Sequence, residues 1–174
     1  MQRKMFLLGI IAVVSVGLVV SSLFFLLPFF SRQHVSLKDK VETIFVSFEN
    51  GENMTVYSST SEGAKLLSAC EDFMSNIYGQ WMWAVTDKGV AHAKNSSLYV
   101  VVELKDTYNF TFFVWAYNGE RTTTANTILF FLSGSYKNTV LYARVGTEEF
   151  PWSGSFGAES RAFQNLVNVV SELS

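Results

Sequence analysis

The hydrophobic pattern of residues 109–117 indicates a β-strand with apolar side chains on both faces. Successive side chains of a strand leave opposite sides of the sheet. One face would carry Phe110, Phe112, Val114 and Ala116, and the other Thr111, Phe113, Trp115 and Tyr117. Residues 127–132, with the sequence TILFFL, likewise place apolar side chains on both faces. Because a half-exposed strand alternates apolar with polar residues, the pattern predicts a sheet covered on both faces, at least in its centre.

Turn residues between the apolar segments predict successive antiparallel hairpins. Asn50-Gly51 separates two strand patterns, and this pair favours the positive φ angles of a two-residue turn. Further turns are expected at 87–89, 105–108, 118–119 and 133–138. The strands between these turns would be residues 41–48, 53–58, 81–86, 90–94, 98–104, 109–117, 120–124, 127–132 and 139–145. Short connections of this kind are typical of an antiparallel meander.

Two segments have the spacing of amphipathic helices. The first opens at a capping box, Ser59 to Glu62, and Gly79 is a plausible end for it. Its apolar stripe would hold Leu66, Cys70, Phe73, Ile77 and Trp81. The second runs from about Ala158 to Leu173, with Phe163, Leu166, Val170 and Leu173 on one face. The predicted fold class is α+β, in the order hairpin, helix, meander, helix: a twisted antiparallel sheet with two packed helices.

The amino-terminal segment predicts a membrane anchor. Residues 5–30 contain no charged side chain. A helix from Met5 to Leu27 would be about 34 Å long, enough to cross a hydrocarbon layer of about 30 Å. We therefore expect residues 1–30 to be a transmembrane anchor in contact with the lipid bilayer. A polar stalk at 31–40 and one extracytoplasmic α+β domain at 41–174 would follow it.

Cleavage of this segment as a signal peptide is the alternative, since Val20-Ser21-Ser22 is a passable cleavage site. Cleavage there would leave the apolar sequence LFFLLPFF at the new amino terminus, which favours an uncleaved anchor. Basic residues flank the segment almost equally on its two sides, so the positive-inside rule leaves the orientation open. The short leading segment favours an outside domain. Three sequons, at Asn53, Asn95 and Asn109, are compatible with this and are possible glycosylation sites.

Charge and cysteine content narrow the class of protein. The chain has 13 basic and 15 acidic residues and no run of lysine or arginine, so nucleic acid is not an expected partner. The single cysteine, Cys70, permits no internal disulfide. Because it lies on the predicted apolar stripe, we expect a small buried core residue rather than a reactive thiol.

The sequence offers no recognisable catalytic or metal-binding pattern. His34 and His92 lie far apart without cysteine neighbours, and the glycines of SGSFG, residues 153–157, lack the spacing of a serine nucleophile turn. Neither a cofactor nor a metal is expected. A hydrolase with an unusual site around His92 is the least favoured of the functional hypotheses.

The favoured hypothesis is a single-pass, membrane-anchored, non-enzymatic interaction or ligand-binding domain of the cell envelope. Its candidate binding residues are Phe113, Trp115, Tyr117 and Trp152, the last from a glycine-rich loop expected at 146–160. An envelope protein or an apolar, aromatic-stacking ligand would bind there. The competing interpretation is that helices or sheet curvature cover these rings. An accessory subunit of a membrane protein complex is the second functional hypothesis.

Overall fold

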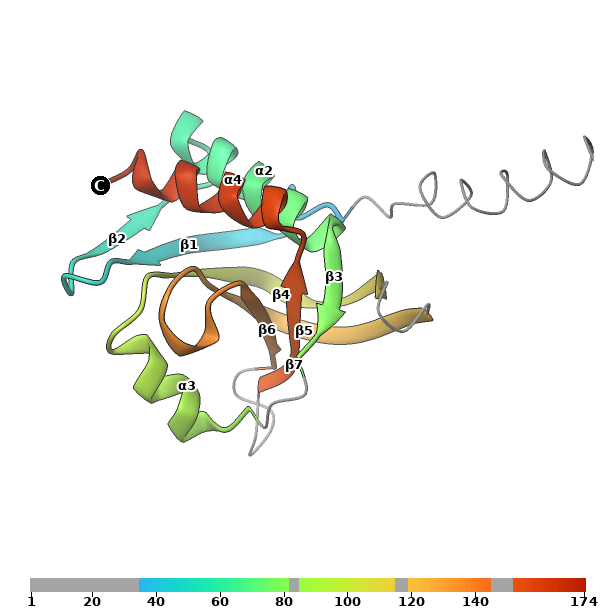
Figure 1. The fold of residues 1–174 in the computed structure, drawn as a ribbon. Helices are drawn as coiled ribbons and strands as arrows, with labels where there is room; N and C mark the ends of the chain where they lie inside the picture. The colour runs from blue at the N-terminus through green and yellow to red at the C-terminus, as the bar shows by residue number, and fades with distance from the viewer. Residues whose placement is uncertain (1–34, 82–84, 115–118, 145–151) are drawn as a thin grey trace, which may run out of the picture. The chain divides into compact units, whose positions relative to one another are not determined.

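The computed structural model describes residues 35–81, 85–114, 119–144 and 152–174, within a unit that spans Gln33–Ser174. This part of the chain is a mixed α+β fold with a seven-stranded antiparallel sheet (Figure 1). The strands are β1 (Val41–Ser47), β2 (Asn53–Val56), β3 (Ile77–Gln80), β4 (Tyr99–Val114), β5 (Gly119–Phe131), β6 (Thr139–Ala143) and β7 (Trp152–Ala158). The helices are α2 (Ser61–Ser75), α3 (Asp87–Lys94) and α4 (Ser160–Ser171), with a 3₁₀ turn η2 (Gly134–Tyr136).

None of the helices in these ranges is long and apolar enough to cross a membrane. The apolar segment 5–30, on which the anchor prediction rests, lies outside the described residues.

The strand order is β2-β1-β4-β5-β6-β7-β3, and each neighbouring pair is antiparallel. The predicted hairpin around Asn50-Gly51 is confirmed, but its turn differs. Phe48 N–H donates to Glu52 O at 2.9 Å, and Gly51 N–H donates to Phe48 O at 3.0 Å. Only Gly51 has a positive φ in this loop, at 86°. The connection is therefore a three-residue loop that ends in a left-handed glycine, a common alternative to the two-residue turn.

The prediction of a turn at residues 105–108 is wrong, because the two strands expected on either side of it form the single strand β4. Pairing with β5 shifts register between Glu103 and Tyr108, which marks a bulge. Lys105, Asp106 and Thr107 are exposed at this bulge, so their polarity reflects solvent contact and not a chain reversal. The expected strands 120–124 and 127–132 likewise merge into β5. The turn expected at Asn118-Gly119 lies partly outside the described residues.

A third helix replaces the predicted hairpin around residues 87–89. Thr86 caps α3 by accepting a hydrogen bond from Gly89 N–H at 3.1 Å. Val90 and Ala93 lie one helical turn apart and are both buried. His92, expected on a strand, is exposed on this helix.

The two predicted helices are confirmed with shifted ends. The N-cap of α2 is Thr60, one residue after the predicted Ser59, and its hydroxyl accepts from Gly63 N–H at 3.0 Å. The helix ends before Ile77, which begins β3, and Trp81 follows that strand. Buried residues of α2 include Leu66, Cys70 and Phe73, and those of α4 include Phe163, Leu166 and Val170. The two helices contact each other along one side of the sheet (Figure 1).

Both faces of the sheet centre are covered, as the doubled apolar pattern predicted. The main face, packed against α2 and α4, carries Val100 and Val102 of β4 with Ile128 and Phe130 of β5. Phe130 meets Phe73 of α2 edge-to-face, with ring centroids 5.4 Å apart. The second face packs against α3 and η2. Its buried strand residues are Val101, Leu129, Phe131 and Leu141, and they cluster with Val90 and Ala93 of α3 and with the partly buried Tyr136 of η2. The sequence predicted the double cover but not the helix that provides the second one.

The far half of β4 and β5 extends beyond β1 and β6, whose pairing stops near Glu103 and Thr127. Its main-face rings are buried against β6 and β7: Phe112 stacks on Tyr142 at 5.7 Å and meets Phe156 edge-to-face at 4.6 Å. Phe156 belongs to β7, which replaces part of the loop expected at 146–160. The remainder of that loop, residues 146–151, lies outside the described residues.

The segment that leads into β1 lies against α2. Val35 and Leu37 are buried, and the Glu71 carboxylate accepts from the backbone amides of Leu37 and Lys38, the latter at 3.2 Å. Ser75 Oγ accepts from Val35 N–H at 3.2 Å. Residues 35–40 of the expected stalk thus pack on the domain.

Candidate functional site

The two predicted aromatic binding residues that the structure describes lie on different strands. Phe113 is half-buried near the end of β4, opposite Glu120 of β5. Trp152 is half-buried in β7. It pairs with Ala143 of β6, which pairs with Thr127 of β5, which in turn pairs with Glu103 of β4. Phe113 lies ten residues further along β4, next to Phe112, whose ring packs on Tyr142 of β6 and Phe156 of β7. Trp115 and Tyr117 lie outside the described residues, so the proposed set stays a prediction.

Trp152 contributes to the second-face cluster together with a lysine. Lys94 Nζ lies 5.3 Å from the ring centroid of Trp152 and 5.4 Å from that of Tyr99. Desolvation lowers the pKa of Lys94, and the nearby Glu103 carboxylate opposes this shift. The ammonium group is therefore an internal cation–π partner of both rings.

The strand surface around Phe113 is mostly polar. Thr111 and Thr122 hydroxyls lie 3.0 Å apart across β4 and β5, and Thr124 donates to Asn109 Oδ1 at 2.7 Å. These cross-strand pairs lie on the face opposite the buried Phe110 and Phe112, as strand alternation requires. Among the described residues, this part of the second face thus carries hydroxyl and amide groups beside Phe113.

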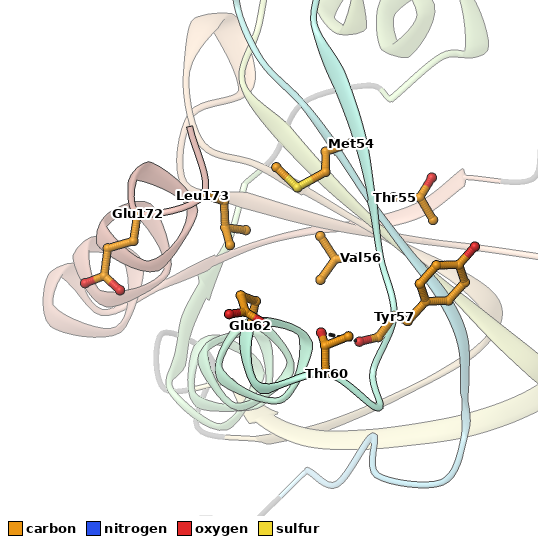
Figure 2. A pocket seen from close by; sticks show the side chains of 8 residues that line it. All are labelled: Met54, Thr55, Val56, Tyr57, Thr60, Glu62, Glu172 and Leu173. Carbon is orange, nitrogen blue, oxygen red and sulfur yellow. Dashed lines mark hydrogen bonds between the residues drawn. The ribbon is translucent and has the colours of Figure 1, made fainter.

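An open depression of about 350 Å³ lies beside β2, at one edge of the sheet. Its lining comes from β2, from the start of α2 and from the end of α4, and consists of Met54, Thr55, Val56, Tyr57, Thr60, Glu62, Glu172 and Leu173. Figure 2 shows the side chains of Met54, Val56 and Leu173 gathered at its centre, with Thr60 and Glu62 bordering it from α2. The depression is therefore apolar in the middle and carries carboxylates at its border.

The backbone of β2 is open on the side away from β1. Phe48 and Glu52 form a hydrogen-bonded pair at the hairpin loop, and such pairs alternate along an antiparallel ladder. Met54 therefore turns its backbone groups towards β1, whereas Asn53 and Thr55 turn theirs outward. Within the described residues no strand pairs with this outer side. The edge strand carries no proline, and its pairing with β1 has no register shift.

The chain between β2 and α2 is fixed by close contacts. Thr60 Oγ1 donates to Tyr57 O at 2.9 Å, and Thr60 N–H donates to the same oxygen at 3.0 Å. A Cβ on Gly63 would collide with the carbonyl oxygen of Tyr57, so a side chain at this position would force the turn apart. The start of α2 is thereby held against the end of β2, which gives the depression a defined border.

The charged residues at this border are acidic. Hydrogen bonds from its own backbone amide and from Ser61 lower the pKa of Glu62, so this carboxylate is ionised at neutral pH. Glu172 lies 3.8 Å from Lys65 Nζ, and both side chains are about two-thirds exposed, at 66% and 68%. Exposed pairs of this kind contribute little to stability. The arrangement can bind a cationic or hydrogen-bonding group.

Other candidate chemistry is placed as follows. Cys70 is fully buried in the main core, as predicted, and burial raises the pKa of its thiol. Among the described residues no three His, Cys, Asp or Glu side chains come close enough together to hold a metal ion. Ser155 is buried and donates to Trp81 O at 2.6 Å. Asn53, Asn95 and Asn109 are exposed, and their glycosylation stays a prediction.

A scan against protein-family models, a search of curated proteins and a search of solved structures each found no match.

Sequence reasoning did not identify the β2 depression. The strand itself was expected, because it follows an Asn-Gly turn, but nothing local marks it as the edge strand. The two glutamates that border the depression, Glu62 and Glu172, are more than a hundred positions apart in the sequence. The only local signal was the absence of proline, lysine or arginine from β2, which are common protective residues of edge strands.

Proposed function

We propose that this protein is a single-pass, membrane-anchored, non-enzymatic interaction domain facing out of the cytoplasm, and that it binds an extended polypeptide segment along β2. The apolar sequence 5–30 supports the anchor. Strand addition to a free sheet edge uses main-chain hydrogen bonds for affinity and pockets beside the edge for specificity. A protein that supplies such a segment would be the partner in the envelope.

The observation that carries the binding proposal is the outward-facing backbone of Asn53 and Thr55 next to an open apolar depression. A strand added there would lie about 4.8 Å from β2 and direct alternate side chains over Met54, Val56 and Leu173. Since β2 is only four residues long, few hydrogen bonds would form. We therefore expect modest affinity, suited to a reversible interaction.

A proline at position 55 tests this mode of binding. Thr55→Pro removes an amide that points away from β1, and edge strands tolerate proline at such positions, so the fold should persist. Peptides selected on the full chain in detergent micelles, from a random twelve-residue library, should bind Thr55→Pro at least about tenfold more weakly, which is the effect of losing about 1.4 kcal/mol. Thr55→Val, which keeps the amide, is the control and should bind as the wild type does.

Equal binding to Thr55→Pro and to the wild type would rule out strand addition at β2, as would failure to select any peptide. Near-ultraviolet circular dichroism of each variant verifies that the fold is retained.

The anchor has its own test. Replacing Val14 and Leu18 by arginine places two charges in the middle of the apolar segment, each costing about 2.5–3.5 kcal/mol at the centre of a bilayer. The full chain should then move from the membrane pellet to the supernatant after carbonate extraction. Val14→Leu with Leu18→Val is the matched control and should stay in the pellet. A wild-type chain found in the supernatant would contradict the anchor.

A further inference from the structure

We infer that the segment bound at β2 is basic: an apolar residue flanked, two positions away on each side, by lysine or arginine. This inference rests on the proposed strand addition and specifies the chemistry of the partner. It follows from what lies beneath an added strand at this edge.

The apolar requirement comes from the centre of the depression. Side chains of an added strand alternate between the two faces of the sheet, so every second one would lie on the side of the depression. Met54 and Val56 border that side from β2, and Leu173 borders it from the end of α4. Met54 and Leu173 are only partly buried, so an apolar side chain placed between them would remove further apolar surface from water.

The basic requirement comes from the border. Of the eight described lining residues two are glutamates, Glu62 and Glu172, and none is basic. Lys65 is near, but its pair with Glu172 is long and solvent-exposed, so a cationic side chain from a partner can compete for that carboxylate. Two further exposed carboxylates, Glu49 and Glu52, lie at the hairpin end of β2. The charge along this edge therefore favours a cationic segment and disfavours an acidic one.

An extended polypeptide fits this surface better than a free cation does. Asn53 and Thr55 present backbone donors and acceptors in alternation, which a second extended backbone matches. A small cation would use the carboxylates alone and make no hydrogen bond with the outward backbone groups of Asn53 and Thr55.

Designed peptides test the inference. Three fluorescein-labelled, threonine-rich peptides carry a central leucine flanked at alternate positions by lysine, by glutamine or by glutamate. Their binding to the full chain in non-ionic micelles is followed by fluorescence polarisation at low salt. The lysine peptide should bind about fivefold more tightly than the glutamine peptide, the effect of two exposed ion pairs. The glutamate peptide should bind most weakly.

The double variant Glu62→Gln, Glu172→Gln should reduce the lysine preference to less than about twofold. A matched variant, Glu42→Gln with Asp106→Asn, removes two exposed carboxylates outside the lining and should keep the preference. Added salt should reduce the preference in the wild type, because it screens exposed charges.

The outcomes separate the inference from the proposed function. Equal binding of the three peptides, with all binding lost in Thr55→Pro, would overturn the basic preference and leave strand addition intact. A lysine preference that survives in the Glu62→Gln, Glu172→Gln variant would also overturn the inference. Failure of every peptide to bind, or binding that Thr55→Pro does not affect, would overturn both.

Discussion

The two faces of the sheet are covered in different ways. Two helices that contact each other, α2 and α4, lie over the main face, and the buried cluster there includes residues of all seven strands. The second face has α3, only eight residues long, and the short turn η2, and the buried strand residues of this smaller cluster are Val101, Leu129, Phe131 and Leu141. Beyond α3 the second face becomes polar, at Thr111 and Thr122. The difference indicates that packing on the main face contributes most of the stability of the domain, whereas packing of α3 and η2 on the second face contributes less.

The largest expected effect compares two adjacent residues of β5. Phe130 and Phe131 are both fully buried but point to opposite faces. Phe130→Ala should lower the free energy of unfolding by about 4–5 kcal/mol, because two docked helices cannot settle into the cavity. Phe131→Ala should cost about 3 kcal/mol, since the short α3 can move towards the gap. Urea denaturation measures both, and a greater loss for Phe131→Ala would reverse the comparison.

A polar atom inside the main face gives the next largest effect. Tyr142 Oη is buried and has no hydrogen-bond partner among the described residues, and burial raises the pKa of this phenol. An unsatisfied buried hydroxyl costs about 1–3 kcal/mol. Tyr142→Phe keeps the ring contacts with Phe112 and Phe156 and should raise the free energy of unfolding by about 1 kcal/mol. A loss of stability in thermal or urea denaturation would indicate that the hydroxyl has a partner.

Substitutions at the helix N-caps test whether α3 can unfold independently of the rest of the domain. Thr60→Ala and Thr86→Ala remove equivalent N-cap hydrogen bonds from α2 and α3. Each should cost about 1 kcal/mol. We expect the cost of Thr86→Ala to appear as faster amide hydrogen exchange within α3 at an unchanged denaturation midpoint, because a helix of eight residues is marginal on its own. Thr60→Ala should instead shift the midpoint of the whole domain. Identical exchange patterns for the two variants would show that α3 unfolds only with the rest.

The smallest expected effect concerns the lysine of the second face. Desolvation lowers the pKa of Lys94 in the folded state, so between that value and the ordinary 10.5 the unfolded chain binds more protons. Stability should therefore rise with pH through this interval. Lys94→Met keeps the length of the side chain and removes the titration. The difference in unfolding free energy between wild type and variant, measured at several pH values from 8 upward, should shift in favour of the wild type. A flat difference would show that the ammonium group is fully solvated.

The contrast between the faces also explains which elements the sequence could predict. The helices of the main face are long enough to repeat an apolar stripe, so Leu66, Cys70 and Phe73 in α2 and Phe163, Leu166 and Val170 in α4 were identified from spacing alone. In α3 only Val90 and Ala93 are buried, and the sequence Ala-His-Ala-Lys, residues 91–94, alternates apolar with polar residues as a strand would. A single helical turn of contacts is too short to distinguish the two periods.

Non-local pairing accounts for the other differences. The polar residues 105–108 are compatible with either a turn or a bulge, and only pairing with β5 decides between them. The edge position of β2 depends on β4 pairing with β1, although β2, α2, β3 and α3 lie between them in the sequence, and no local pattern encodes this pairing. For that reason the predicted site followed the aromatic residues, and the depression beside β2 was not identified.

The contact between Glu71 and the backbone of Leu37 and Lys38 has a mechanical consequence. A pulling force that enters the domain from its amino-terminal side reaches this contact before it reaches the first residue of β1. The load is then shared by α2 instead of peeling β1 from β4 one hydrogen bond after another. In single-molecule stretching from that end, Glu71→Ala should therefore yield at a lower force than the wild type.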